Sequence, residues 1–353
     1  MAVRDDIQNL SGYRYSRRKA QTKLDQNESP DDLPMKVKEA LLTRLAEIPF
    51  NRYPEPDARQ LRRRIAAKHD WEEPGVVVAG GSNELIRSAV ITAGIGRSVV
   101  TVKPTFPVYA DQARILSAEL IEIPLTETFE LPLQAIAEAL EGRRGVVFIA
   151  NPAAPTGNLF GREQLEHLAQ RTARDWILIL DEAYHQFASS DSLSLVRRHP
   201  HLVSLRTFSK AFGLGGVRVG YGFAHPDLAT EMRKTVMPFA LSALQVAAAE
   251  AALDLDHLVR ERVEATLRER KRLHQALASL GTHPYPSETN FILFRVPDPE
   301  AVFEGLVQRG VLVRRQDHLD SLAGALRVTV GRPEENEKFL QALATVLGVK
   351  AGD

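Results

Sequence analysis

Residues 202–216 read Leu-Val-Ser-Leu-Arg-Thr-Phe-Ser-Lys-Ala-Phe-Gly-Leu-Gly-Gly, and this stretch decides the fold. It begins with a short apolar run, Leu202–Thr207, which is typical of a buried strand. A turn rich in glycine and phenylalanine follows, and Lys210 lies inside it. A lysine in such apolar surroundings is out of place as a solvated surface residue. The stretch therefore predicts a strand that delivers a lysine to a functional site.

Similar apolar runs recur between about residues 75 and 225, separated by segments with helical spacing. The runs are Val76–Ala79, Ser98–Val102, Gly145–Ala150, Trp176–Leu180, Leu202–Thr207 and Val219–Phe223. The helical segments are Asn83–Ala93, Leu133–Leu140 and Glu163–Thr172. Near-continuous apolar strands that alternate with helices predict a mostly parallel sheet with both faces covered. We expect this part of the chain to form a large α/β domain.

A smaller α+β unit is expected toward the C-terminus. A long helical stretch, Ser242–Leu280, ends at Gly281, as helices often do. The elements expected after it are strands Asn290–Val296, Val311–Arg314 and Leu326–Val330 and helices Pro299–Arg309 and Pro333–Leu347. Near the N-terminus, Pro34–Glu47 has the pattern of a helix with proline in its first turn. The irregular segment before that helix is expected to pack across the small unit and the cleft.

The length of 353 residues favours two domains over a single core. We expect residues 1–45 to form an N-terminal arm and part of the small domain. Residues 46–275 are expected to form the large domain that binds the ligand, and residues 276–353 the small C-terminal domain.

Composition narrows the class of function. Lysine plus arginine and aspartate plus glutamate number 45 each, and no block of like charge suggests a nucleic-acid or membrane surface. The absence of cysteine removes disulfides and thiolate chemistry and suits a reducing cytoplasm. Residues 1–18 mix charges, and no apolar run approaches a membrane span. We therefore expect a cytoplasmic protein that acts on small molecules.

Two other kinds of site are not expected. The ten histidines are scattered, and only His199 and His201 lie close together, in what we expect to be a surface loop. A His-Glu-x-x-His run is lacking, so no metal site is predicted. Gly80-Gly81 lacks the third glycine of the dinucleotide fingerprint, which argues against a dinucleotide.

Polar residues recur just past the ends of the predicted strands. Ligands of open α/β sheets bind at the carboxyl ends of the strands, so these residues should converge. Asp181 follows one such strand; taken alone, it fits the N-cap of a helix better than a site residue. Burial lowers the pKa of a lysine, and the neutral amine of Lys210 can then form an imine with a carbonyl cofactor.

A second group of residues suits a phosphate monoester. Thr207, Ser209 and Arg218 supply hydroxyls and a planar guanidinium fork. Gly81-Ser82-Asn83 opens a helix, where free N–H groups favour an anion, although Gly-Gly-Ser alone is more often a plain turn.

Jointly these motifs resemble the aspartate-aminotransferase fold family, the fold type I enzymes that depend on pyridoxal 5′-phosphate, over nearly the whole chain. The resemblance implies that Lys210 forms the Schiff base with the cofactor, that Asp181 pairs with the pyridinium nitrogen and that Tyr184 donates to the 3′ oxygen. The residues implied around the phosphate and the ring are Gly81, Ser82, Asn83, Thr207, Ser209, Arg218 and, stacked on the ring, Phe106.

Asn51-Arg52-Tyr53-Pro54 matches the segment of this family whose tyrosine reaches the cofactor phosphate of a neighbouring subunit. That match implies a homodimer with shared active sites. On the sequence alone, an exposed Tyr-Pro turn is an equally good interpretation of Tyr53.

One position departs from the family pattern. In Asn151-Pro152-Ala153-Ala154-Pro155-Thr156-Gly157, Ala154 stands where the family has an asparagine that shares the 3′ oxygen with the tyrosine. We expect slower transamination and a raised pKa of the lysine–cofactor linkage, unless a neighbour such as Asn158 compensates. A non-catalytic pyridoxal-phosphate-binding protein is the alternative, but the chain lacks the DNA-binding segment that such regulators carry.

Within the family the chain looks most like the histidinol-phosphate aminotransferases of histidine biosynthesis. The segments that carry this resemblance are Leu24–Pro30, Asn51–Pro54, Arg206–Phe212, Val311–Arg314 and Arg327–Asn336. The resemblance implies that Arg314, Arg327 and Tyr13 hold the substrate phosphate, that Asn27 contacts the substrate, and that glutamate and 2-oxoglutarate use the same site.

Other interpretations remain open at this stage. Aromatic amino acid aminotransferases and threonine-phosphate decarboxylase share most of these motifs. Arg327 alone also fits an edge-strand arginine that faces solvent.

Overall fold

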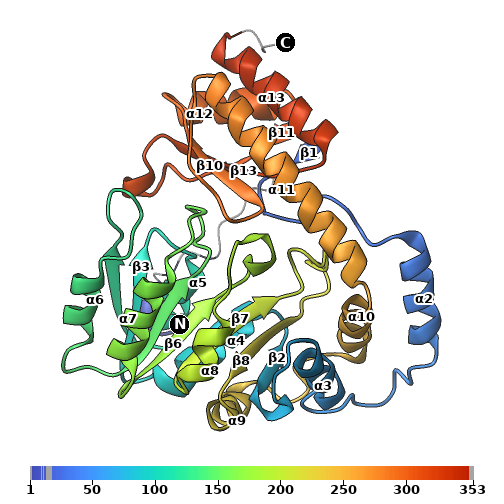
Figure 1. The fold of residues 1–353 in the computed structure, drawn as a ribbon, viewed down its shortest axis with the longest axis vertical. Helices are drawn as coiled ribbons and strands as arrows, with labels where there is room; N and C mark the ends of the chain where they lie inside the picture. Colours follow the sequence, from blue (N-terminus) through green and yellow to red (C-terminus); the bar gives the residue numbers. More distant parts are fainter. Residues whose placement is uncertain (1, 9, 11, 13–17, 350–353) are drawn as a thin grey trace.

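The structure is a computed structural model that describes residues 2–8, 10, 12 and 18–349. It contains a large unit built on a seven-stranded sheet and a smaller unit that lies above it in Figure 1. In spatial order the large sheet consists of β2 (Val76–Ala79), β8 (Gly220–Ala224), β7 (Leu202–Thr207), β6 (Trp176–Asp181), β5 (Gly145–Ala150), β3 (Ser98–Lys103) and β4 (Glu119–Pro124). Strand β8 is antiparallel to both of its neighbours, and the other pairs are parallel. The predicted mostly parallel sheet is confirmed.

Helices cover both faces of this sheet. Successive residues of a strand point to opposite faces, so Val146 joins one apolar cluster and Val147 the other. One face packs against α4 (Ser82–Ala93), α5 (Val108–Ile115) and α9 (Pro226–Thr235). The opposite face packs against α6 (Leu133–Leu140), α7 (Arg162–Thr172) and α8 (Leu193–Arg198). Beside β2 and β8 lies a third cluster, which includes α3 (Arg59–Lys68) and α10 (Ala243–Leu253).

The small unit has an antiparallel sheet with the order β12 (Arg314–Arg315), β13 (Ala325–Thr329), β10 (Phe291–Arg295) and β9 (His283–Pro284). Helices α12 (Pro299–Gln308) and α13 (Pro333–Leu347) pack with it around one apolar core. From the N-terminal arm, β1 (Thr22–Lys23) pairs in parallel with β11 (Val311–Leu312). The arm therefore pairs with a strand that packs in the core of the small unit. The short elements α1 (Asp5–Gln8), η1 (Glu73–Gly75), η2 (His185–Phe187) and η3 (Asp320–Leu322) complete the chain.

The helical stretch predicted over 242–280 is two helices, so the single element was wrong. Helix α10 ends at Leu253, and α11 (Asp256–Ser279) begins after Leu255, whose backbone is not helical (φ −101°, ψ 33°). The break lets the alanine-rich α10 pack on the large unit while α11 runs up to the small unit (Figure 1). The expected boundary at residues 275 and 276 lies inside α11, and the domain limits stay a prediction.

Several elements carry no clear pattern in the sequence. Strand β4 lies at the edge of the sheet and contains both charged and apolar side chains. Half of its residues are half-buried. Helices α3, α5, α8 and α9 are short and were not predicted. The strand expected over 311–314 is divided between β11 and β12, which pair with different partners. Helix α2 (Met35–Ala46) lies within one residue of its predicted limits at each end.

Candidate active site

The polar residues that follow the strands meet at one edge of the large sheet. Because β2 and β7 are each antiparallel to β8, they run in the same direction as β5 and β6. Asp181 lies opposite Ala150, and Thr207 and Ala79 flank Gly220 in register. The turns after β2, β6 and β7 therefore lie close together at the carboxyl edge, where ligands of such sheets bind.

Lys210 lies at the centre of this edge. Its Nζ donates to the backbone oxygen of Gln26 at 3.1 Å and lies 5.7 Å from the ring centre of Tyr184. Burial, with help from the positive charges of Arg327 and Arg218, lowers the pKa of this half-buried lysine to about 7. A large fraction of the amine is therefore neutral near pH 7, as a nucleophile requires.

Asp181 is buried at the end of β6. Its Oδ2 accepts a hydrogen bond from the Tyr109 hydroxyl at 2.7 Å, and its Oδ1 accepts one from the Ala183 N–H at 3.2 Å. Burial raises the pKa of Asp181 to about 6, and these two hydrogen bonds oppose that rise. A buried carboxyl of this kind is suited to pair with a cationic ring nitrogen, because the positive charge would favour the ionised form of the carboxyl.

Tyr109 is a site residue that the sequence reasoning missed. It lies on α5, three residues after Phe106, and the two rings meet edge to face at 5.8 Å. Tyr109 also stacks on Phe148 at 4.9 Å, which holds its hydroxyl toward the carboxylate of Asp181. The signal available in the sequence was a second aromatic residue, with a hydroxyl, one helical turn beyond Phe106.

The turn after β2 and the loop before β8 form a compact anion cradle. Gly81 has φ +99°, and a Cβ added there would lie 2.7 Å from Nη2 of Arg218. The Nη1 of Arg218 donates to Ser209 Oγ at 3.2 Å, and the Ser209 N–H donates to Thr207 Oγ1 at 3.0 Å. Ser82 and Asn83 are the first residues of α4, and among the described residues no side chain caps this helix start.

Close approach of the backbone makes this cradle possible. A Cβ at Gly220 would lie 2.2 Å from the backbone nitrogen of Ser82, so β8 touches the start of α4 only because it has a glycine there. The open N–H groups of α4, the guanidinium of Arg218 and the Ser209 hydroxyl thus gather at one place. This donor set fits a phosphate monoester.

Tyr184 and Ala154 share an apolar cluster with Phe187, Ala211 and Phe291. The Tyr184 hydroxyl accepts a hydrogen bond from Nδ2 of Asn27 at 2.9 Å. The side-chain nitrogen of Asn158, named above as a possible substitute for an asparagine at 154, donates instead to the backbone oxygen of Phe129 at 3.1 Å.

Arg314 and Arg327 lie directly opposite each other on β12 and β13. The Nη2 of Arg327 donates to the backbone oxygen of Asp25 at 2.9 Å, and its guanidinium lies 5.1 Å from the ring centre of Phe291. Directly opposed residues of antiparallel strands point to the same face, so the two arginines form a pair. The edge-strand interpretation of Arg327 is wrong, because β13 lies between β12 and β10.

Two further residues of the predicted site are Tyr53 and Tyr13. Tyr53 is 84% exposed, and its ring stacks on that of Phe239 with the ring centres 4.8 Å apart. That position is compatible with the predicted role in a neighbouring subunit. Tyr13 lies outside the described residues.

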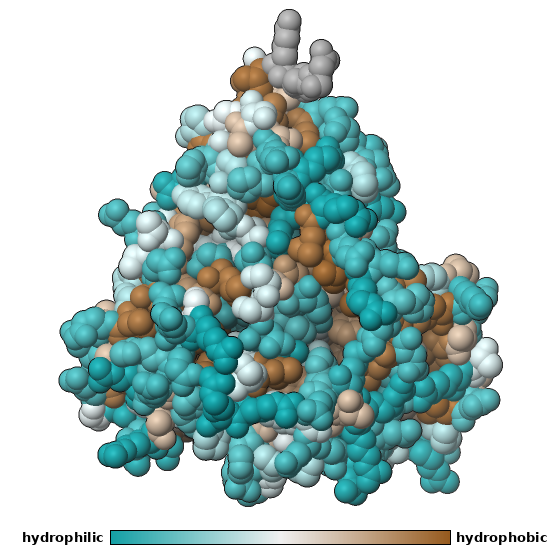
Figure 2. Space-filling model, in the orientation of Figure 1, coloured by the Kyte–Doolittle hydropathy of each residue, from teal (hydrophilic) through white to brown (hydrophobic). Residues whose placement is uncertain are grey.

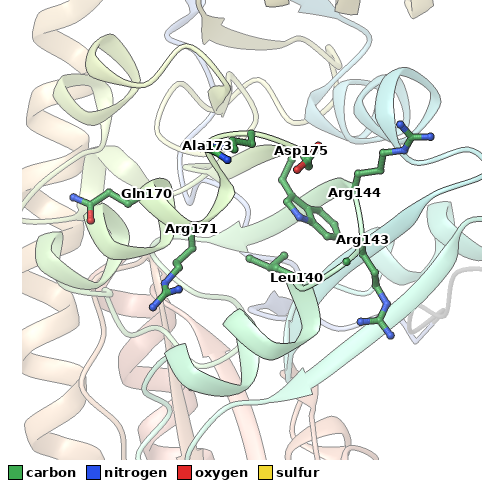
Figure 3. Close-up of a pocket in the computed structure, with 10 residues that line it drawn as sticks. Leu140, Arg143, Arg144, Gln170, Arg171, Ala173 and Asp175 are labelled. Carbon is green, nitrogen blue, oxygen red and sulfur yellow. The ribbon is translucent and has the colours of Figure 1, made fainter.

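A surface hollow of about 520 Å³ lies at the opposite edge of the sheet, before β5 and β6 (Figure 3). The arginines Arg143, Arg144, Arg171 and Arg174 line it, and the three that Figure 3 labels, Arg143, Arg144 and Arg171, point in different directions. Within the described ranges, no cluster of three or more His, Asp or Glu side chains is arranged to hold a metal ion. In the same part of the chain, no helix is both long and apolar enough to cross a bilayer.

Comparison with known proteins identifies the family of this chain. Residues 19–343 match the model of the family described as aminotransferase class I and II. The chain belongs to this aminotransferase family. It is 40% identical to the histidinol-phosphate aminotransferase of Deinococcus radiodurans, over 97% of this chain and 95% of the relative. It is 36% identical to the enzyme of the same name from Thermococcus gammatolerans, over 97% and 96% of the two chains.

Solved structures agree on the fold. The crystal structure of histidinol-phosphate aminotransferase from Sinorhizobium meliloti in complex with pyridoxal-5′-phosphate superposes with a TM-score of 0.89 and 24% identity, over 98% of each chain. The predicted fold class is confirmed. Class I and II aminotransferases depend on pyridoxal 5′-phosphate, so the chain is a pyridoxal-phosphate-dependent aminotransferase. The lysine with its lowered pKa, the buried acid and the anion cradle fit that cofactor.

Proposed function

We propose that this aminotransferase moves the amino group of histidinol phosphate to 2-oxoglutarate in histidine biosynthesis. The observation that carries the proposal is the pair Arg314 and Arg327, side by side on β12 and β13. Arg327 is close enough to Lys210 for its charge to lower the pKa of the lysine amine. The names of the Deinococcus and Thermococcus relatives support the same substrate.

The arginine pair suits both substrates of such a reaction. Histidinol phosphate carries a phosphate and no carboxylate, whereas glutamate and 2-oxoglutarate carry two carboxylates. A planar guanidinium binds either group through two parallel hydrogen bonds. We infer that the two arginines hold the substrate phosphate in one half-reaction and a carboxylate in the other.

The remaining roles follow from the contacts described above. Lys210 would hold the cofactor covalently and, once released, would carry the proton from the substrate Cα. Asp181 would hold a proton on the ring nitrogen. When bound, the cofactor supplies an electron-withdrawing ring that accepts the charge left at Cα.

Other residues would hold and orient the ring. Tyr184 would donate to the phenolic oxygen of the ring, and Phe106 would cover one ring face. The phosphate would be bound by Gly81, Ser82, Asn83, Thr207, Ser209 and Arg218.

A homodimer with shared sites is part of this proposal. Helix α2 lies at the rim of the molecule beside α10 (Figure 1), where Arg44 pairs with Glu250. None of the residues of α2, all of them described, is buried. Apolar surface gathers on this side of the molecule (Figure 2). The exposed large apolar side chains here and near α10 are Met35, Leu42, Phe50, Tyr53, Met237, Phe239 and Leu244. A surface of this kind supports a second copy of the chain as its partner, with Tyr53 reaching the partner's cradle.

The test is a screen of the first half-reaction with the cofactor-loaded enzyme. Histidinol phosphate, glutamate, phenylalanine and threonine phosphate are added separately, and loss of the visible absorption band is followed. We expect histidinol phosphate to act at a far lower concentration than phenylalanine. A preference for phenylalanine would indicate an aromatic aminotransferase, and CO₂ release from threonine phosphate without 2-oxoglutarate would indicate a decarboxylase.

Controls separate binding from chemistry. Lys210→Ala should lose both the visible band and turnover, and a variant that kept the band would contradict the assignment of Lys210. Failure of every amine to react would favour the non-catalytic alternative. A cytoplasmic location, expected from the cysteine-free sequence, stays a prediction.

A further inference from the structure

The segment Leu24–Asn27, here called the strap, links the small unit to two residues of the active site. The Leu24 N–H donates to the Leu312 oxygen at 2.8 Å, and the Thr329 N–H donates to the Leu24 oxygen at 2.9 Å. Gln26 then presents its backbone oxygen to the amine of Lys210. The strap is therefore held on the sheet of the small unit while its end lies in the site.

Asn27, at the end of the strap, is fixed by hydrogen bonds from its backbone and its side chain. It is 2% exposed and adopts φ +54°, a left-handed conformation that asparagine tolerates better than most residues. Thr329 Oγ1 accepts from the Asn27 N–H at 2.9 Å and donates to Asn27 Oδ1 at 3.2 Å. Asn290 Nδ2 donates to the Asn27 backbone oxygen at 3.1 Å. These contacts fix which way the amide points.

The fixed amide aims its nitrogen at Tyr184. Asn27 Nδ2 donates to the Tyr184 hydroxyl oxygen at 2.9 Å, and both side chains are buried. A hydroxyl that accepts one hydrogen bond becomes a stronger donor in another, because hydrogen bonds in a chain polarise one another. The accepted bond also directs the hydroxyl hydrogen of Tyr184 away from Asn27.

Ala154 supplies no donor in the same apolar cluster, where the family pattern has an asparagine. We propose that Asn27 is a positioning residue that replaces that asparagine indirectly, by strengthening Tyr184 as the donor to the phenolic oxygen of the cofactor. This inference rests on the role given to Tyr184 in the proposed function. The proposal gives Asn27 a role that needs no direct contact with the substrate, because its side-chain amide already bonds to Thr329 and Tyr184.

Charged and titratable groups of the described residues lie close to Tyr184. The amine of Lys210 faces its ring, and Tyr109 with its partner Asp181 lies on the same edge of the sheet. A donor aimed at the phenolic oxygen of the cofactor stabilises its anionic form, which lowers the pH midpoint of the visible band. Loss of the Asn27 amide should therefore raise that midpoint.

The first test uses two variants of the cofactor-loaded enzyme. Asn27→Asp keeps the shape of the side chain and replaces its donor by an acceptor, and Asn27→Gly removes the side chain at a backbone conformation that glycine adopts readily. For both we expect the midpoint to rise by up to about one pH unit, a tenfold change in the proton equilibrium and the upper end of what one hydrogen bond contributes. The matched control is Asn158→Ala, which removes a neighbouring amide that faces Phe129 and should leave the midpoint unchanged.

The second test asks whether the effect passes through Tyr184. In a Tyr184→Phe background, Asn27→Gly should no longer move the midpoint. Ala154→Asn should lower the midpoint markedly in the Asn27→Gly background and only slightly in the wild type. Equal shifts in the two backgrounds would overturn the proposal. If the Asn27 variants do not fold, the effect of Ala154→Asn in the wild type still decides it, because a marked shift of the midpoint there would overturn the proposal.

Kinetics give an independent criterion. We expect Asn27→Gly to lower kcat roughly three- to tenfold with little change in KM for histidinol phosphate, as for a lost interaction that matters mainly in the transition state. A raised KM with an unchanged midpoint would make Asn27 a direct substrate contact and would overturn the inference. Failure of the proposed function is distinguishable, because the wild type would then fail to convert histidinol phosphate whatever its midpoint.

Discussion

Burial sets the charge state of the two residues on which the chemistry depends. The same physical cause acts in opposite directions, because it lowers the pKa of the Lys210 amine to about 7 and raises that of the Asp181 carboxyl to about 6. Hydrogen bonds then adjust the acid, and the bond from Tyr109 pulls its pKa back down. The site is therefore poised near neutral pH by its surroundings.

Tyr109→Phe tests this balance. Without the hydroxyl, the pKa of Asp181 should rise further, so that less of the acid is ionised at a given pH below neutrality. The acid limb of the kcat/KM profile should then move to higher pH by up to about one unit, the effect of one hydrogen bond. Tyr285→Phe, whose ring packs against Phe129 in the apolar core, serves as the control and should leave the limb in place. An unmoved limb in Tyr109→Phe would contradict the role given to this tyrosine.

At the scale of secondary-structure elements, the cradle depends on the backbone at the start of α4. Gly81→Ala forces a Cβ into a left-handed conformation and against the guanidinium of Arg218. Backbone strain of this kind costs about 1–3 kcal/mol, so we expect cofactor affinity to fall by about five- to 150-fold. Titration of the cofactor-free protein with pyridoxal phosphate measures it. Gly80→Ala is the matched control, because its nearest contact, the Ala240 oxygen at 3.6 Å, is an ordinary one; equal losses in both would refute the argument.

A buried ion pair joins β6, β7 and the loop before α8 beneath the site. Arg206 Nη2 contacts Glu182 at 2.8 Å and Asp191 at 2.9 Å, and Arg206 and Glu182 are almost completely buried. Glu182 follows Asp181 directly, so this pair supports the strand end that carries the acid. The pattern of the sequence placed Arg206 inside an apolar strand but did not reveal its partner.

Removal of one member of this ion pair should destabilise the folded protein. Arg206→Met leaves the Glu182 carboxylate buried with a missing partner, and we expect the free energy of unfolding to fall by about 3–5 kcal/mol. Arg198→Met removes the exposed pair with Glu166 and should cost under about 1 kcal/mol. Urea unfolding of the two variants compares them directly. A loss for Arg206→Met as small as that for Arg198→Met would show that the pair is not structurally important.

For the whole molecule, the exposed apolar surface around α2 predicts an assembly. Leu42 is 64% exposed on α2, and Leu42→Lys should weaken a dimer that buries this helix. We expect the mass measured by light scattering to fall toward that of one chain at micromolar concentration, together with activity if Tyr53 completes the partner's site. Ile95→Lys, at a similarly exposed residue after α4, is the control and should leave the mass unchanged. A wild-type protein that is monomeric at all concentrations would refute the dimer.

Local sequence patterns were sufficient for the central strands, because each of these strands is a short apolar run. The roles of Lys210, Asp181 and the two arginines were inferred from a glycine-rich turn and from motifs of the family, and they stay predictions. Hydrophobic periodicity and the positions of glycine and proline did not predict elements that depend on tertiary contacts. Examples are the break between α10 and α11 and the edge strand β4.

The residues that tune the site were decided by the tertiary structure. Tyr109 and Asp181 are 72 positions apart, and Asn27 and Tyr184 are 157 positions apart. A hydrogen bond between such residues depends on how the sheet, α5 and the strap pack together, and no local pattern encodes that distance. Lys210 could therefore be predicted from its own stretch of sequence, whereas the donor that stands in for the asparagine missing at 154 emerged only when the small unit brought the strap into the site.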